Sequence, residues 1–359
     1  LRQLSARRNR QDRRLLLEPL EDRNLLAVAN VVGSELQVTL ENNDTVFIRQ
    51  KGSDIFVGTS SNSGDVFNGT QAVDALSVTG AGGTETVNFE QPAGATFFTV
   101  LTQGISTDAA VENVNVDVAI NTAGGGASGD VSLSAHTVFM RSNVFTDGGD
   151  VTISASNNLR FLGNNLTIDT EDGGDSDAGD ILLAGSAKIQ GIINFGQTYN
   201  LRTDTVGGTG GAITLPSGGA FDIATQFYDS RGSGGDGLIE LNGGVIGDAG
   251  GQVNFAGDVV LNASVVIRTN ANPVEEGGAV DLQNATISAA NANADLTIRT
   301  DVNIFNSGSI TLGEFNNDAG HYVRNLTMET DGLSTDGSIT LTDTVQISGD
   351  LTSESGAGN

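Results

Sequence analysis

The chain contains no cysteine and no tryptophan, and only four of its 359 residues are proline. The absence of cysteine excludes disulfide bonds and every metal or iron–sulfur site that needs thiolate ligands. Aromatic residues make up only 5% of the chain, so a core of large rings is not expected. No stretch approaches the roughly 20 apolar residues that a membrane-spanning helix needs. These absences favour a narrow core built from Val, Ile and Leu.

Basic residues are also scarce, with 17 Lys and Arg against 44 Asp and Glu and a net charge of −27. Many of the bases gather near the amino terminus, namely Arg2, Arg7, Arg8, Arg10, Arg13, Arg14 and Arg23. The rest of the chain is therefore strongly acidic. Such a surface repels nucleic acid and anionic membranes, because phosphate binding needs clustered cations. It favours solubility and the capture of cations such as calcium. We expect no nucleic-acid partner.

Glycine is abundant, with 49 residues, and it falls in short clusters without the G-X-Y period of collagen. From about residue 105 a glycine followed by a short alternating strand recurs. Its copies include Gly129-Asp-Val-Ser-Leu133, Gly149-Asp-Val-Thr-Ile153, Gly179-Asp-Ile-Leu-Leu183, Gly237-Leu-Ile-Glu-Leu241, Gly251-Gln-Val-Asn-Phe255, Gly308-Ser-Ile-Thr-Leu312 and Gly337-Ser-Ile-Thr-Leu341. A second unit precedes several of these, as in Leu166-Thr-Ile-Asp-Thr170, Leu296-Thr-Ile-Arg-Thr300 and Leu326-Thr-Met-Glu-Thr330. Several spacings cluster at roughly 30 residues, which indicates a solenoid, a propeller or a stacked array. The short gap from Gly237 to Gly251 suggests a second strand within one turn.

The strand pattern decides among these architectures. Ile339 and Leu341 alternate with Ser338 and Thr340, so only two or three apolar residues per strand point inward. That suits a thin core stacked coil on coil, whereas propeller blades carry aromatic signatures that are missing here. The prediction is an all-β fold, a parallel β-helix preceded by a small antiparallel β-region and a short basic segment. The expected divisions are 1–27 for the basic export-type segment, 28–104 for a small β-region or solenoid cap, and 105–359 for solenoid repeats that continue beyond this fragment.

The amino-terminal segment carries a resemblance to a known family. Leu17-Glu-Pro-Leu-Glu-Asp-Arg-Asn-Leu-Leu26 follows the arginines and resembles the LEPR-XLL-type segment of very large exported bacterial surface proteins. The match covers about a dozen residues, and Leu20-Glu-Asp22 intervene between Pro19 and Arg23. The resemblance implies export and an extracellular or cell-surface setting. It implies nothing about catalysis.

The repeats are similar in style to those of filamentous-haemagglutinin-like adhesins. We therefore expect a structural or adhesive segment of a secreted or cell-surface repeat protein. Its expected partners are extracellular matrix, cell-surface molecules or other proteins. The chain is not expected to be an enzyme.

One acidic segment is the sharpest candidate for a bound ion. Six carboxylates lie among flexible glycines in a dozen residues, namely Asp169, Glu171, Asp172, Asp175, Asp177 and Asp180. Calcium takes six to eight oxygen ligands, so this segment is a candidate calcium site. The alternative is a solvated acidic turn between coils, because neither EF-hand spacing nor the calcium-binding nonapeptide pattern is present. No other cofactor is expected.

The alternative function is a carbohydrate-active β-helix enzyme, either a polysaccharide lyase or a hydrolase. Such a site needs clustered acids together with an arginine or lysine. Arg268 and Arg299 occupy equivalent repeat positions and are expected on one outer face near Glu329 and Asp169. A repeating exposed position is equally explained as a solvated strand face. A cleft lined by paired carboxylates and an arginine would favour the enzyme.

Overall fold

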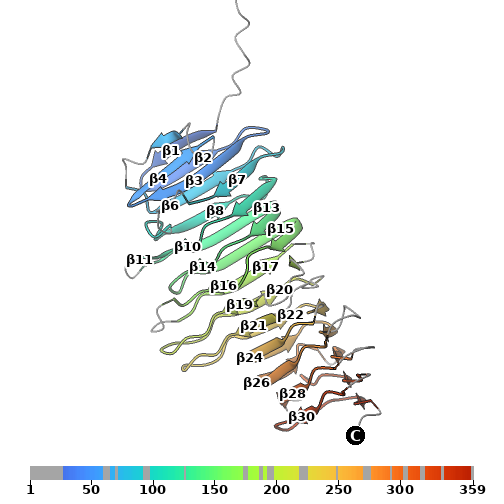
Figure 1. Cartoon of the computed structure of the whole chain (residues 1–359). Helices are drawn as coiled ribbons and strands as arrows, with labels where there is room; N and C mark the ends of the chain where they lie inside the picture. The colour runs from blue at the N-terminus through green and yellow to red at the C-terminus, as the bar shows by residue number, and fades with distance from the viewer. Residues whose placement is uncertain are drawn as a thin grey trace, which may run out of the picture.

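The computed structural model describes residues 27–59, 65–68, 72–91, 98–124, 127–172, 177–185, 189–191, 198–217, 225–247, 250–269, 276–291, 293–301, 306–315, 320–332 and 335–356. These residues form an all-β solenoid whose strands stack along one long axis (Figure 1). Nearly all neighbouring strands in the stack run parallel, which confirms the predicted parallel β-helix. The described residues contain no helix, and hence none that is long and apolar enough to cross a membrane.

The strands fall into three columns, which the chain visits in the order A, B, C. Column A contains β2 (Glu35–Thr39), β6 (Ala75–Thr79), β8 (Gly104–Thr107), the first halves of β13 (Asp130–Met140) and β15 (Val151–Phe161), β17 (Ile181–Ala184), β20 (Ile213–Leu215), β22 (Leu238–Leu241), the second halves of β24 (Val253–Leu261) and β26 (Val280–Ala289), and the end of β28 (Ile310–Phe315).

Column B holds β3 (Thr45–Lys51), β7 (Thr86–Phe89), β9 (Asn113–Val116), the second halves of β13 and β15, β18 (Ile189–Gly191), and then β23 (Gly244–Ile246), β25 (Val265–Arg268), β27 (Leu296–Arg299), β29 (Leu326–Glu329) and β31 (Leu351–Glu354). Column C holds β10 (Ile120–Asn121), β14 (Val144–Phe145), β16 (Leu166–Asp169), β19 (Thr198–Arg202), β21 (Thr225–Asp229), the first halves of β24, β26 and β28, and β30 (Ile339–Leu341).

Antiparallel strands cover the amino-terminal end of the stack. β1 (Val28–Val32) pairs antiparallel with β2, and β4 (Asp54–Gly58) and β5 (Asp65–Asn68) extend β3 in the same way. β11 (Ala123–Gly124) and β12 (Ala127–Ser128) form a small separate hairpin. Parallel pairing already begins between β2 and β6 and between β3 and β7, so the pairing pattern does not change at residue 105.

The interior is filled by alternate residues of each strand. In β27, Leu296 and Ile298 are buried while Thr297 between them is half-exposed, as period-2 alternation predicts. The few rings stack along the interior: Tyr228 lies 4.7 Å from Phe255, and Phe161 lies 5.5 Å from Tyr199 between ring centroids. The core is therefore a continuous file of aliphatic side chains with occasional aromatic layers.

A buried hydroxyl closes one corner of most described coils. It comes from the residue just after a strand and donates to the carbonyl oxygen of the glycine that opens the next strand. We call this the hydroxyl–glycine bond. The pairs are Thr122–Gly129, Thr146–Gly149, Thr170–Gly179, Thr203–Gly211, Ser230–Gly237, Thr269–Gly278, Thr300–Gly308 and Thr330–Gly337. Each of these hydroxyl-bearing side chains is at most 1% exposed.

The glycines of these bonds stack on one another so closely that a side chain does not fit. A Cβ built on Gly308 would lie 2.0 Å from the carbonyl oxygen of Gly278, and one on Gly337 would lie 1.9 Å from that of Gly308. This close approach explains why the recurring strand begins with glycine.

The closed corner changes along the chain. Up to Gly237 the hydroxyl–glycine bond joins the end of column C to column A, whereas from Thr269 onward it joins column B to column C. Near this change, Gly237 precedes β22 in column A and Gly251 precedes β24 in column C of the same coil. The predicted second strand within the short 237–251 gap is thus confirmed.

Candidate functional site

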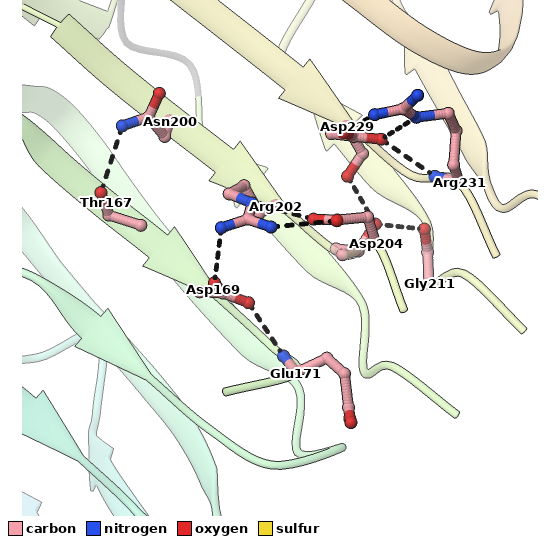
Figure 2. Close-up of polar contacts among 10 residues, drawn as sticks. Thr167, Asp169, Glu171, Asn200, Arg202, Asp204, Gly211, Asp229 and Arg231 are labelled. Carbon is pink, nitrogen blue, oxygen red and sulfur yellow. Dashed lines mark hydrogen bonds and ion pairs between the residues drawn. The ribbon is translucent and has the colours of Figure 1, made fainter. Parts of the chain in front are cut away.

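Charged side chains gather at the carboxyl ends of neighbouring column C strands. Asp169 of β16, Arg202 of β19 and Asp229 of β21 occupy the same register position in successive coils. Asp204 and Arg231 follow two residues after Arg202 and Asp229. We call these five residues the charged row, and Figure 2 shows them side by side.

Ion pairs join the members of the charged row. The guanidinium of Arg202 donates to both carboxylate oxygens of Asp204, at 2.9 and 3.0 Å, and its Nη1 lies 3.5 Å from Asp169 Oδ2. Arg231 binds Asp229 in the same two-bond manner, at 2.8 and 2.6 Å. The hydrogen bonds that Arg202 donates to Asp204 hold the pKa of Arg202 above its ordinary value. Each cation thus has an anion two residues away on its own chain segment.

Asp169 is the most enclosed acid of the charged row, with only 7% of its surface exposed. Its Oδ1 accepts a hydrogen bond from the backbone N–H of Glu171 at 3.1 Å. Burial raises the pKa of the Asp169 carboxyl, and this effect outweighs the opposing contributions of the Glu171 N–H and of Arg202. A carboxyl with a raised pKa beside an arginine is the feature of this surface that most resembles an acid–base site.

The other predicted calcium ligands that the structure describes lie along the corner between columns C and A. Asp177 Oδ1 accepts from the backbone N–H of Thr209 at 2.8 Å, and Asp180 Oδ1 accepts from that of Ala212 at 2.7 Å. Glu171 is buried and forms a backbone bridge to Asp147, while Asp172 is exposed. Asp175 lies outside the described residues.

Asp180 belongs to a repeated contact between coils. Asp130 Oδ1 accepts from the backbone N–H of Asp150 at 2.9 Å, and Asp150 Oδ1 accepts from that of Asp180 at 2.8 Å. Each carboxylate therefore caps the backbone of the following coil. Among the residues that the structure describes, no group of three or more His, Cys, Asp or Glu side chains is placed to hold a metal ion. The calcium site stays a prediction.

The expected cluster around Arg268 and Arg299 forms only in part. The two arginines share a register position in column B, and Arg299 Nε lies 3.0 Å from Glu329 Oε2, as expected. Asp169 lies in column C and pairs with Arg202 instead, so its expected place near Arg268 and Arg299 was wrong. The repeat motif occupies column C at residues 166–170 but column B at residues 296–300, which is why equivalent motifs do not share a face.

The charged row was not predicted as a cluster, because its two arginines look scattered in the sequence. A local signal does exist, since Arg202-Thr-Asp204 and Asp229-Ser-Arg231 place opposite charges two residues apart. Residues two apart along an extended chain project to the same side. What brings the two segments together is the coil period, which varies along the chain.

Two cavities in the described part of the chain lie away from the charged row. One of about 550 Å³ near the amino-terminal strands is lined by Ser34, Ser53, Asp54, Ala72, Val73, Asp74 and Val100. The other, of about 370 Å³, lies along column A and is lined by residues that include Leu182, Thr214, Pro216 and Asn242. Neither is lined by a residue of the charged row.

Comparison with known proteins found no matching family model, no matching curated protein and no matching solved structure. The functional argument therefore rests on the geometry of this chain.

Proposed function

We propose that the chain is a non-catalytic structural or adhesive segment of an extracellular or cell-surface protein, with matrix, cell-surface or protein partners. The observation that carries this proposal is that many charged side chains bind groups of a neighbouring coil. The carboxylates of Asp130, Asp150 and Asp180 each accept a hydrogen bond from a backbone N–H of the next coil. Arg299 with Glu329, and Arg324 with Asp295, also pair between coils. Side chains that bind neighbouring coils support a load-bearing rod.

The alternative is a carbohydrate-active enzyme acting at the charged row. Asp169, with its raised pKa beside Arg202, is the observation that favours it. Against it, Arg202 and Arg231 are each engaged in two-bond pairs with their own aspartates, which reduces their capacity to stabilise a developing negative charge.

The experiment that separates the two functions is a depolymerisation assay. The chain is incubated with neutral polysaccharides and with polygalacturonate, and new reducing ends and unsaturated products are measured. We expect neither product above the buffer background. Products that Asp169→Asn abolishes, with an unchanged circular dichroism spectrum, would establish the enzyme and overturn the structural proposal.

A second measurement tests the load-bearing role directly. When the chain is pulled through its ends in a single-molecule instrument, coils should detach one after another. A coil of roughly 30 residues releases about 100 Å of extended chain. Regular steps of this size at sustained force support the proposal. A chain that extends without resistance would contradict it.

A further inference from the structure

One strand of column C reverses the usual division between inward and outward side chains. In β21, Gln226 points into the core and is 1% exposed, whereas the neighbouring Phe227 is 37% exposed. Phe227 is the only aromatic residue among the exposed large hydrophobic residues of the described part of the chain. In a chain with so few aromatic residues, a ring exposed to this degree requires an explanation.

Packing does not supply that explanation. Gln226 Oε1 accepts a hydrogen bond from the Tyr228 hydroxyl at 2.6 Å, but Gln226 Nε2 is buried without a partner among the described residues. A buried donor without an acceptor is unfavourable, and an exposed phenyl ring forgoes burial. A strand that buries an unpaired polar group and exposes an aromatic ring departs from normal packing at both positions, and such departures are expected at functional sites.

Carboxamide groups flank the ring along the axis of the solenoid. Thr167, Asn200, Phe227, Asn254 and Asp281 occupy one register position in successive coils of column C. Neighbouring strands lie roughly 4.8 Å apart, so Asn200 and Asn254 are one strand away from the ring on either side. We call these five residues the polar row.

The two asparagines retain hydrogen-bonding capacity. Asn200 Nδ2 donates to Thr167 Oγ1 at 3.2 Å, as Figure 2 shows, and Asn200 Oδ1 has no partner among the described residues. Asn254 is half-buried, and its Nδ2 is buried without a partner among the described residues, so this group can donate to a ligand only after the side chain turns outward. The charged row runs beside them, with its arginines already paired to aspartates.

An exposed ring between amide groups has the chemistry that recognises a sugar. The face of a pyranose carries C–H groups that pack on an aromatic ring, while its hydroxyl groups exchange hydrogen bonds with carboxamides. The net charge of −27 disfavours an anionic polymer, and the paired arginines do not offset it. We propose that Phe227, flanked by Asn200 and Asn254, is a binding subsite for a neutral polysaccharide that lies along the polar row. This inference rests on the adhesive form of the proposed function and names its partner class.

The test is affinity electrophoresis of the full chain in native gels. The gels contain galactomannan, soluble starch or hydroxyethyl cellulose as neutral probes and polygalacturonate as the anionic probe. We expect at least one neutral polymer to retard the chain. Phe227→Ala should weaken that retardation at least about tenfold, because one stacking contact is lost. Phe227→Trp should retain it.

The matched control is Phe139→Ala. Phe139 lies on the outer face of column B, with the guanidinium carbons of Arg141 and Arg160 at 5.3 and 5.9 Å from its ring centroid. This variant also loses an outward ring but should bind as the parent chain does. Circular dichroism of both alanine variants establishes that each is folded.

Three outcomes would overturn the inference: retardation by polygalacturonate alone, equal weakening by both alanine variants, or no retardation by any of the three neutral polymers. None of these outcomes affects the two tests of the proposed function, which are the depolymerisation assay and the pulling experiment. Failure of the subsite is therefore distinguishable from failure of the proposed function.

Discussion

The hydroxyl–glycine bond should contribute measurably to stability, and Thr300 allows a clean test. Its side chain is fully buried, and its Oγ1 donates to the carbonyl oxygen of Gly308 at 2.6 Å. Thr300→Val replaces the hydroxyl with a methyl group of similar size, so the cavity contribution is small. The variant loses the hydrogen bond and leaves a buried carbonyl oxygen without this donor. We expect the free energy of unfolding to fall by about 2 kcal/mol.

The strand that ends just before Thr300 supplies the control. Thr297 lies three residues earlier in β27, points outward and is half-exposed. Thr297→Val is expected to change the free energy of unfolding by less than about 0.5 kcal/mol, as for most surface substitutions. Both variants carry the same chemical change at positions three residues apart, and they differ in burial and in the hydrogen bond.

The assay is urea denaturation followed by far-ultraviolet circular dichroism. Because each coil contacts only its neighbours, we expect part of the loss as local opening near the substitution, so amide hydrogen exchange around Gly308 should be followed in parallel. Equal effects of Thr300→Val and Thr297→Val on both measurements would refute the role assigned to the bond.

Three further predictions concern the glycine stack, the buried acid and the calcium site. Gly308→Ala places a Cβ 2.0 Å from the carbonyl oxygen of Gly278, so it should destabilise the chain by roughly 1–3 kcal/mol or more; an unchanged urea midpoint would contradict the stacking argument. Burial raises the pKa of Asp169, so between the unfolded pKa of about 3.9 and the raised folded value the folded chain keeps a proton that the unfolded chain releases. The contribution of Asp169 to the free energy of unfolding should therefore fall as pH rises through this window. Asp169→Asn should flatten the slope of the free energy of unfolding against pH in that window. Urea titrations that give the variant and the parent chain the same slope would contradict this prediction. If the acidic segment binds calcium, millimolar calcium should raise the melting midpoint, chelator should reverse the rise and Asp175→Asn should reduce it. A midpoint indifferent to calcium would end that prediction.

The sequence by itself determined the fold class. Alternation in segments such as 296–300, glycines at the strand starts and the scarcity of aromatic residues are local properties, and local properties are sufficient to predict thin parallel strands in a stack. The second strand within the 237–251 gap was predicted for the same reason. The closeness of Arg299 and Glu329 also followed from the sequence, because both sit at one motif position in regular neighbouring coils; their ion pair came from the structure.

Only the tertiary structure decided which strands share a face. The coil period varies, and the closed corner moves from the end of column C to the end of column B between Ser230 and Thr269, so one motif serves two columns. Asp169 therefore meets Arg202 rather than Arg299, and Phe227 comes to lie between Asn200 and Asn254. These contacts depend on how many residues each loop inserts between strands. The strand pattern specifies which side chains face outward, and loop length specifies their neighbours.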